Sequence, residues 1–78
     1  MQALKNLHET AAEHFEKAAH HHRLAAEHTE NDEHEMAAHH AMAAHAHAVE
    51  ALENANQASK QHAKTIASDK HEEEEEEV

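Results

Sequence analysis

The chain has 78 residues, among them 13 histidines, 17 Asp or Glu, 6 Lys or Arg, and no Cys, Gly or Pro. Its formal net charge of −11 with neutral histidines disfavours nucleic acid and anionic membranes as partners, and the absence of cysteine excludes disulfides and thiolate metal sites. Polar residues interrupt every apolar stretch, so the sequence predicts no signal peptide and no membrane span, and we expect a cytoplasmic protein.

The first predicted element is a helix over about residues 3–30. Alanine pairs recur in it every seven residues, at Ala11-Ala12, Ala18-Ala19 and Ala25-Ala26. Few bulky apolar residues and a high net charge are also typical of disordered chains. Alanine-rich heptads without Gly or Pro favour the helix, and they indicate a closely packed partner helix.

A turn is predicted at about residues 30–32. Asn31 can adopt the left-handed conformation that ends a helix. Asp32 can cap the next helix, with Glu35 reaching back from the third helical position in a capping box. The sequence therefore predicts two helices in close succession.

The second predicted helix covers about residues 33–67. Beyond it, six consecutive glutamates form a like-charged block that repels itself, so we expect residues 70–78 to be a disordered acidic tail. The structured unit is then a single domain over residues 1–69. Its predicted class is all-α.

Two long helices joined by a short turn predict an antiparallel hairpin. The 3,4-spaced positions suggest which faces meet, because one alignment sets a large side chain against a small one in nearly every layer. The layers pair Ala25 with Ala38, His22 with Ala41, Ala18 with His45, Phe15 with Ala48, Ala11 with Leu52, His8 with Ala55 and Leu4 with Ser59.

A second stripe of small residues and histidines would stay exposed on such a hairpin. Its members are Leu7, Ala12, His14, Ala19, His21, Ala26 and His28 on the first helix and Ala37, Met42, Ala44, Val49, Ala51 and Ala58 on the second. A two-fold homodimer would cover this stripe and form a four-helix bundle, and so small a chain needs the added stabilisation. A monomeric hairpin and a higher oligomer are the alternatives.

The histidines are the residues with chemistry to offer. No two of them have the i,i+3 or i,i+4 spacing with which one helix chelates a metal, so a site must draw imidazoles from different helices. His22 and His45 fall in adjacent layers of the predicted alignment. His14 and His21 lie on the predicted dimer face, and His8 and His34 occupy other seam positions. The candidate metal ligands are His22, His45, His14, His21, His8 and His34. The alternative is packed histidines that hydrogen bond across the helices or to water.

The stretch from Ala11 to His28 and the segment from His39 to His47 resemble a loose group of small bacterial proteins built on repeated Ala-Ala-x-His-His heptads. Phe15 and Thr29 replace imidazole at two of the heptad positions. The resemblance lies in composition. It implies a helical hairpin, and it implies no particular activity, substrate or cofactor.

Three functions fit the sequence. The first is a non-enzymatic buffer or sink for Cu²⁺, Ni²⁺, Co²⁺ or Zn²⁺, ions that neutral imidazole suits. The second is a pH-responsive structural or stress protein without metal, because protonating all the histidines would change the formal charge from −11 to about +2. The third is a haem-binding helical bundle with two histidine ligands. No nucleophile with an orienting base and no phosphate loop is visible, so we expect no enzyme.

Overall fold

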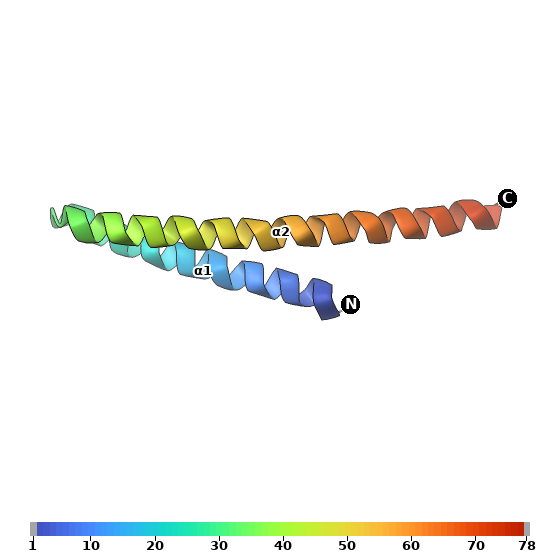
Figure 1. Cartoon of the computed structure of the whole chain (residues 1–78), viewed down its shortest axis with the longest axis horizontal. Coiled ribbons are helices and arrows are strands. Elements are labelled where there is room, and N and C mark those ends of the chain that lie inside the picture. Colours follow the sequence, from blue (N-terminus) through green and yellow to red (C-terminus); the bar gives the residue numbers. More distant parts are fainter. Residues whose placement is uncertain (1, 78) are drawn as a thin grey trace.

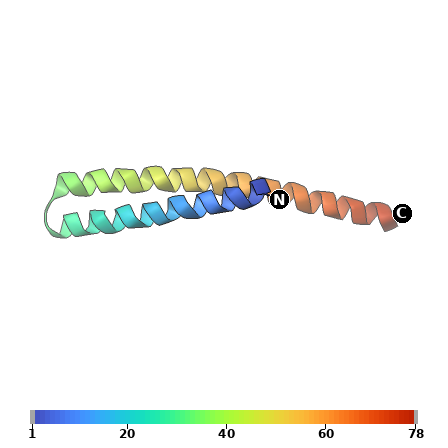
Figure 2. The same cartoon turned by 90° about the horizontal axis from the view of Figure 1, so that it is seen from below.

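The computed structural model describes residues 2–77, with side chains for residues 2–68. It consists of two helices, α1 (Gln2–Glu30) and α2 (His34–Glu77), which run antiparallel as a hairpin (Figures 1 and 2). The described residues contain no strand, and they form a rod of 68 × 18 × 13 Å. The predicted all-α hairpin is confirmed. Neither helix, within the described residues, is long and apolar enough to cross a membrane.

The α2 helix is longer than predicted. It continues to Glu77, past the expected end near residue 67, and it extends well beyond the start of α1 (Figure 1). The residues that follow the expected end include no Gly or Pro to stop the helix, and Glu is a good helix former. The predicted disorder of the acidic tail, residues 70–78, is not confirmed, because the backbone of residues 70–77 belongs to α2.

The turn between the helices is a Schellman motif. The Glu33 N–H donates to the His28 carbonyl over 2.8 Å, and the Asp32 N–H donates to the Thr29 carbonyl over 3.1 Å. The left-handed residue is Asp32, with φ of 59°, and not Asn31 as predicted. Because Asp32 ends α1, it does not cap α2. The Glu33 carbonyl instead accepts the first helical hydrogen bond of α2, from the Ala37 N–H over 3.0 Å.

Asp32→Gly is expected to stabilise the hairpin by up to about 1 kcal/mol, because glycine adopts the left-handed conformation without the steric cost of a Cβ atom. Asn31→Gly is the matched control. It should be neutral or destabilising, since Asn31 does not have a positive φ. Urea unfolding followed by circular dichroism measures both free energies. A larger gain from Asn31→Gly than from Asp32→Gly would contradict the turn assignment.

The helices meet along a seam of alanines. The residues buried there recur every seven positions, and they are Ala11 and Ala18 of α1 and Ala37, Ala44, Ala51 and Ala58 of α2. Methyl side chains allow the two backbones to approach closely, but they bury little apolar surface. Within the described residues no large side chain is fully buried. The hairpin therefore depends on contacts along its length and has no bulky core.

The predicted alignment is correct for the alanines of α1 and wrong for α2. Ala11 and Ala18 lie in the seam as expected, whereas Phe15 and Leu52 are 45% and 53% exposed. On α2 the seam consists of alanines that were predicted to lie at the dimer interface, namely Ala44 and its heptad equivalents. The physical reason is that a fully small stripe lets the helices approach more closely than alternating large and small layers do. The alanines of α2 on the predicted dimer face are therefore covered by α1, whereas Met42 and Val49 of the same predicted face are exposed.

Candidate functional site: histidine pairs across the seam

Five histidines lie beside the alanine seam because of the heptad spacing. On α1, His14 and His21 each follow a buried alanine by three residues, as do His40 and His47 on α2. Positions three residues apart lie on the same side of a helix. These rings are therefore partly buried between the helices, and His28, one heptad after His21, is partly buried as well.

Two pairs of imidazoles meet across the seam. The Nδ1 atoms of His14 and His47 are 3.0 Å apart, and so are the Nδ1 atoms of His21 and His40. Seven residues separate the two members on each helix, so both pairs belong to the same antiparallel register. At this distance one Nδ1 donates its N–H and the other Nδ1 accepts the hydrogen bond.

The same rings stack on one another along the seam. His21 lies parallel to His47, with ring centroids 5.6 Å apart and planes at 9°, and His28 lies parallel to His40 at 5.4 Å and 1°. The rings of the two hydrogen-bonded pairs are also stacked, at 5.3 Å and 5.2 Å. The result is a continuous stack, which we call the histidine ladder. Its order is His14, His47, His21, His40 and His28.

A carboxylate closes the turn end of the ladder. Nδ1 of His28 lies 3.1 Å from Oε1 of Glu33, the residue that follows the left-handed turn position. The turn geometry therefore positions the carboxylate, and the carboxylate orients the last ring.

A third cross-helix pair lies farther from the turn. The Nε2 atoms of His8 and His62 are 2.9 Å apart, and the rings are tilted by 40°. This pair does not share the register of the ladder. Side chains lean toward the N-terminus of their own helix, so residues at different levels of an antiparallel hairpin can lean toward each other and meet. Both rings are exposed.

The structure brings three of the six predicted ligands into pairs, but with partners that were not predicted. His14, His21 and His8 pair with His47, His40 and His62. The signal that could have identified the first two partners is the seven-residue spacing of His40 and His47, which equals the spacing of His14 and His21.

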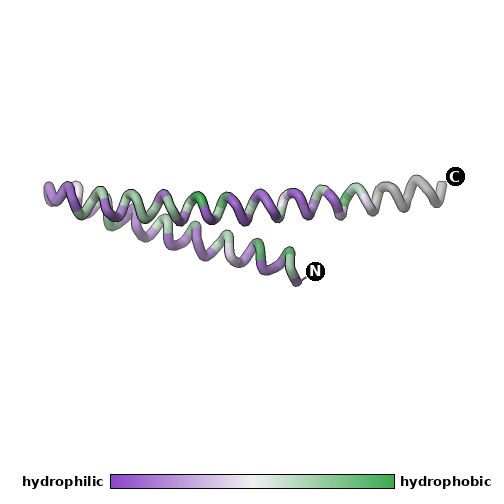
Figure 3. The backbone as a smooth tube through the Cα atoms, in the orientation of Figure 1, coloured by the Kyte–Doolittle hydropathy of each residue, from purple (hydrophilic) through white to green (hydrophobic). Residues whose placement is uncertain are grey.

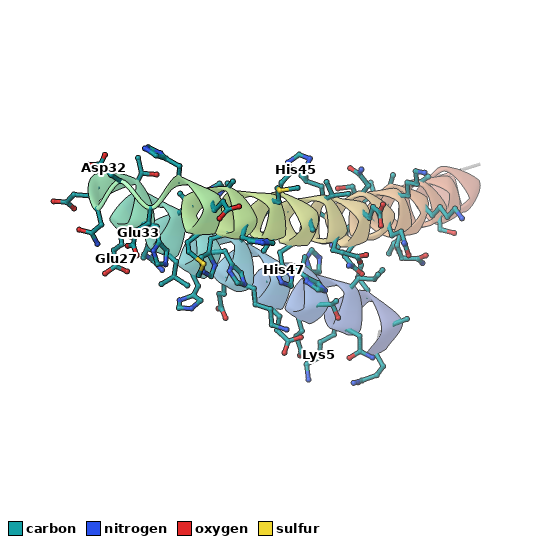
Figure 4. The ribbon with its side chains drawn as sticks, turned by 60° about the vertical axis from the view of Figure 1, so that its left-hand side comes forward. Lys5, Glu27, Asp32, Glu33, His45 and His47 are labelled. Carbon is teal, nitrogen blue, oxygen red and sulfur yellow. The ribbon has the colours of Figure 1, made fainter. Side chains whose placement is uncertain are left out.

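The other three predicted ligands are not part of the ladder. His22 and His45 are exposed, and Figure 4 shows His45 on the side of α2 away from α1, whereas His47 points toward α1. The predicted convergence of His22 and His45 is therefore wrong, because it depended on the wrong face of α2. His34 is exposed at the start of α2, with Nε2 3.9 Å from a carboxylate oxygen of Asp32.

The paired nitrogens are spaced as two ligands of one ion would be. Two nitrogens bound at about 2.0–2.1 Å and at a right angle are about 2.9 Å apart, and in a tetrahedron they are about 3.3 Å apart. The three pairs have separations of 2.9 to 3.0 Å. No group of three or more candidate ligands occurs among the described residues. Each pair therefore offers two ligands and leaves the other coordination positions to water or other molecules.

The position of His40 within the ladder lowers its pKa below the ordinary value of 6.5. Desolvation of the ring is the largest cause, and the charges that the neighbouring His21, His28, His20 and His39 would carry add to it. A neutral ring is the form that accepts a hydrogen bond and binds a metal ion. Packing in the ladder thus favours the chemically useful state.

Comparison of the chain with protein-family models, curated proteins and solved structures gives no match. The resemblance to alanine- and histidine-rich bacterial hairpins therefore stays a prediction. The functional interpretation depends on the geometry of the histidine pairs.

Proposed function

We propose that this chain is a non-enzymatic binder of divalent transition metals, acting as a buffer or sink for Cu²⁺, Ni²⁺, Co²⁺ or Zn²⁺. The observation that supports this function is the set of three cross-helix histidine pairs with ring nitrogens 2.9 to 3.0 Å apart. A cation could replace the shared proton and join the same two nitrogens. The donating ring would first change tautomer, so that its proton moves to the ring nitrogen that faces away from the pair, and both rings would then bind the cation in their neutral form.

The sites we propose are open and of moderate affinity. Each has two imidazoles, and the net negative charge of the chain attracts cations without completing the coordination sphere. For a given set of nitrogen ligands, Cu²⁺ binds most tightly of the first-row divalent ions. The right-angle spacing also suits the tetragonal geometry of Cu²⁺ and Ni²⁺ better than a closed tetrahedral zinc site.

Metal binding is expected to raise the thermal stability of the hairpin, because each ion would clamp α1 to α2 and bind only the folded state. Isothermal titration and thermal unfolding of untagged, metal-free protein measure the two effects. The double variant H40A/H47A should lose two of the three sites. The matched control H22A/H45A removes two exposed histidines and should keep them.

Two results would contradict the metal proposal. One is the absence of binding tighter than millimolar for all four ions. The other is an equal loss of affinity in H40A/H47A and H22A/H45A, which would mean that surface histidines bind without pairing. Circular dichroism at the titration temperature checks that both variants keep the helix content of the parent chain.

A second candidate function, a pH-responsive structural or stress protein, is favoured by the hydrogen bonds of the ladder. Each Nδ1 to Nδ1 contact needs one ring that lacks a proton at that nitrogen, so a fully protonated pair would place two N–H groups against each other. Haem binding, the third candidate, has less support. A porphyrin between paired rings would require the buried alanine seam to open.

A further inference from the structure

The outward face of α2 carries a second heptad stripe that no part of the described chain covers. Its apolar members Val49, Leu52 and Ile66 are 40%, 53% and 55% exposed. Figure 3 shows apolar segments recurring along α2, and Figures 1 and 2 show that α2 extends past the start of α1. The exposed stripe, as we call it, consists of Val49, Leu52, Asn56, Ser59, Ala63 and Ile66.

The exposed stripe is distinct from the alanine seam and from the histidine ladder. Leu52 follows the buried Ala51 by one residue, which turns it by about 100° around the helix axis. Ser59 has the same relation to the buried Ala58. A molecule bound to the exposed stripe would therefore leave the hairpin closed.

The spacing of the exposed stripe is self-complementary. Successive members are three, four, three, four and three residues apart, which reads the same in both directions. A second α2 laid antiparallel would place Leu52 opposite Ala63 of the other copy, and Val49 opposite Ile66. Asn56 would face Ser59 at the centre, where polar side chains can hydrogen bond. Such a surface has the symmetry of a two-fold interface.

The charges beside the exposed stripe favour the same antiparallel arrangement. Glu53 and Lys60 are exposed, and they are seven residues apart on one flank. When the stripe is reversed on itself, Glu53 of each copy comes within two residues, about 3 Å along the axis, of the level of Lys60 of the other. A parallel arrangement would set both residues against alanines, Ala48 and Ala55. Charge complementarity at these flanking positions sets orientation in paired helices.

We propose that the exposed stripe binds a second copy of this chain, with the two α2 helices antiparallel about a centre between Gln57 and Ala58. The resulting dimer has a hairpin on each side and the histidine ladder away from the new interface. This assigns the homodimer to a face that differs from the one expected from the sequence. The interface uses none of the ladder histidines, so it is independent of metal binding at the two ladder pairs, and His62 of the third pair borders it.

Sedimentation equilibrium of the full chain without metal, over a range of concentrations, tests the interface. Leu52→Lys should raise the dissociation constant of the dimer at least tenfold, because it places two charges in the apolar contact. Met36→Lys is the matched control. Met36 is a comparably exposed apolar residue of α2 that lies outside the stripe, so the control should leave the dissociation constant unchanged. A monomer at all concentrations, or equal effects of the two variants, would overturn the proposal.

Charge exchange tests the orientation. E53K and K60E should each weaken the dimer several-fold, and the double variant E53K/K60E should restore it, because opposite charges again face each other. E50K, an exposed charge change away from the contact, should have no effect. Failure of the double variant to recover would overturn the antiparallel pairing.

A spin-label distance tests the same pairing without relying on affinity. The chain has no cysteine, so Ala46→Cys introduces a single labelling position. In the proposed dimer the two labels should be about 35 Å apart along the helices. In a parallel dimer they would be separated only by the distance between axes, about 8–10 Å. A short distance would therefore overturn the proposal.

Discussion

Replacing Ala44 by leucine is expected to destabilise the hairpin by about 1–3 kcal/mol. Ala44 has no exposed surface, and it lies between His40 and His47 on the seam face of α2. A leucine there has no space unless α1 moves outward. Small proteins have only about 5–15 kcal/mol of total stability, so this single substitution would remove a substantial part of it.

Ala46→Leu is the matched control for the seam. Ala46 is exposed, two residues away on the same helix, and the change should alter the free energy of unfolding by no more than about 0.5 kcal/mol. Urea unfolding at a fixed protein concentration measures both variants. Ala44→Leu should also weaken metal binding at the two adjacent histidine pairs. Equal stability of the two variants would mean that the helices pack through another face of α2.

The sequence was sufficient to predict the hairpin because the relevant signals are local. Heptads of alanine without Gly or Pro specify two helices, and the Asn31-Asp32 segment marks the turn to within one residue. Ala11 and Ala18 were also placed correctly, since their seven-residue spacing sets them on one face of α1. These features depend on spacing within one helix. They do not depend on how two helices are aligned.

The contact face of α2 could not be predicted because that helix carries two heptad stripes in different directions. Burial of the larger apolar residues favours the stripe with Leu52, whereas close approach of the backbones favours the stripe with Ala51. The structure selects the second, in which histidines from both helices also form hydrogen bonds. Choosing the first face moved every predicted partner to the wrong side of α2.

The alanine seam and the histidine ladder depend on each other. Fully buried methyl groups at Ala44 and Ala51 hold the helices close enough for Nδ1 atoms of opposite rings to reach 3.0 Å. The imidazole rings in turn bury part of their own surface between the helices, which adds contact area that the small alanine side chains do not provide. A change in the protonation of the rings should therefore affect the stability of the whole hairpin, and so should a bound ion.

Acidification of the metal-free protein is expected to lower the stability of the hairpin below about pH 6.5. The pKa of His40 is lowered in the folded state, first by desolvation and then by His21, His28, His20 and His39, so the unfolded chain binds the proton more readily. The free energy contributed by neutral His40 is therefore complete above the unfolded pKa. It is lost as the pH falls from about 6.5 through the folded pKa.

Thermal unfolding between pH 8 and pH 5 distinguishes this ladder effect from the general change in net charge. H40Q/H47Q replaces one ring in each hydrogen-bonded pair of the ladder by a group that does not titrate, and it should flatten the pH dependence of the melting temperature. H22Q/H45Q removes two exposed histidines and should retain the dependence of the parent chain. If both variants follow the parent, the pH response comes from surface charge, and protonation of the ladder does not open the hairpin. If only the ladder variant is insensitive, the same nitrogens that are proposed to bind metal also make the fold sensitive to protons.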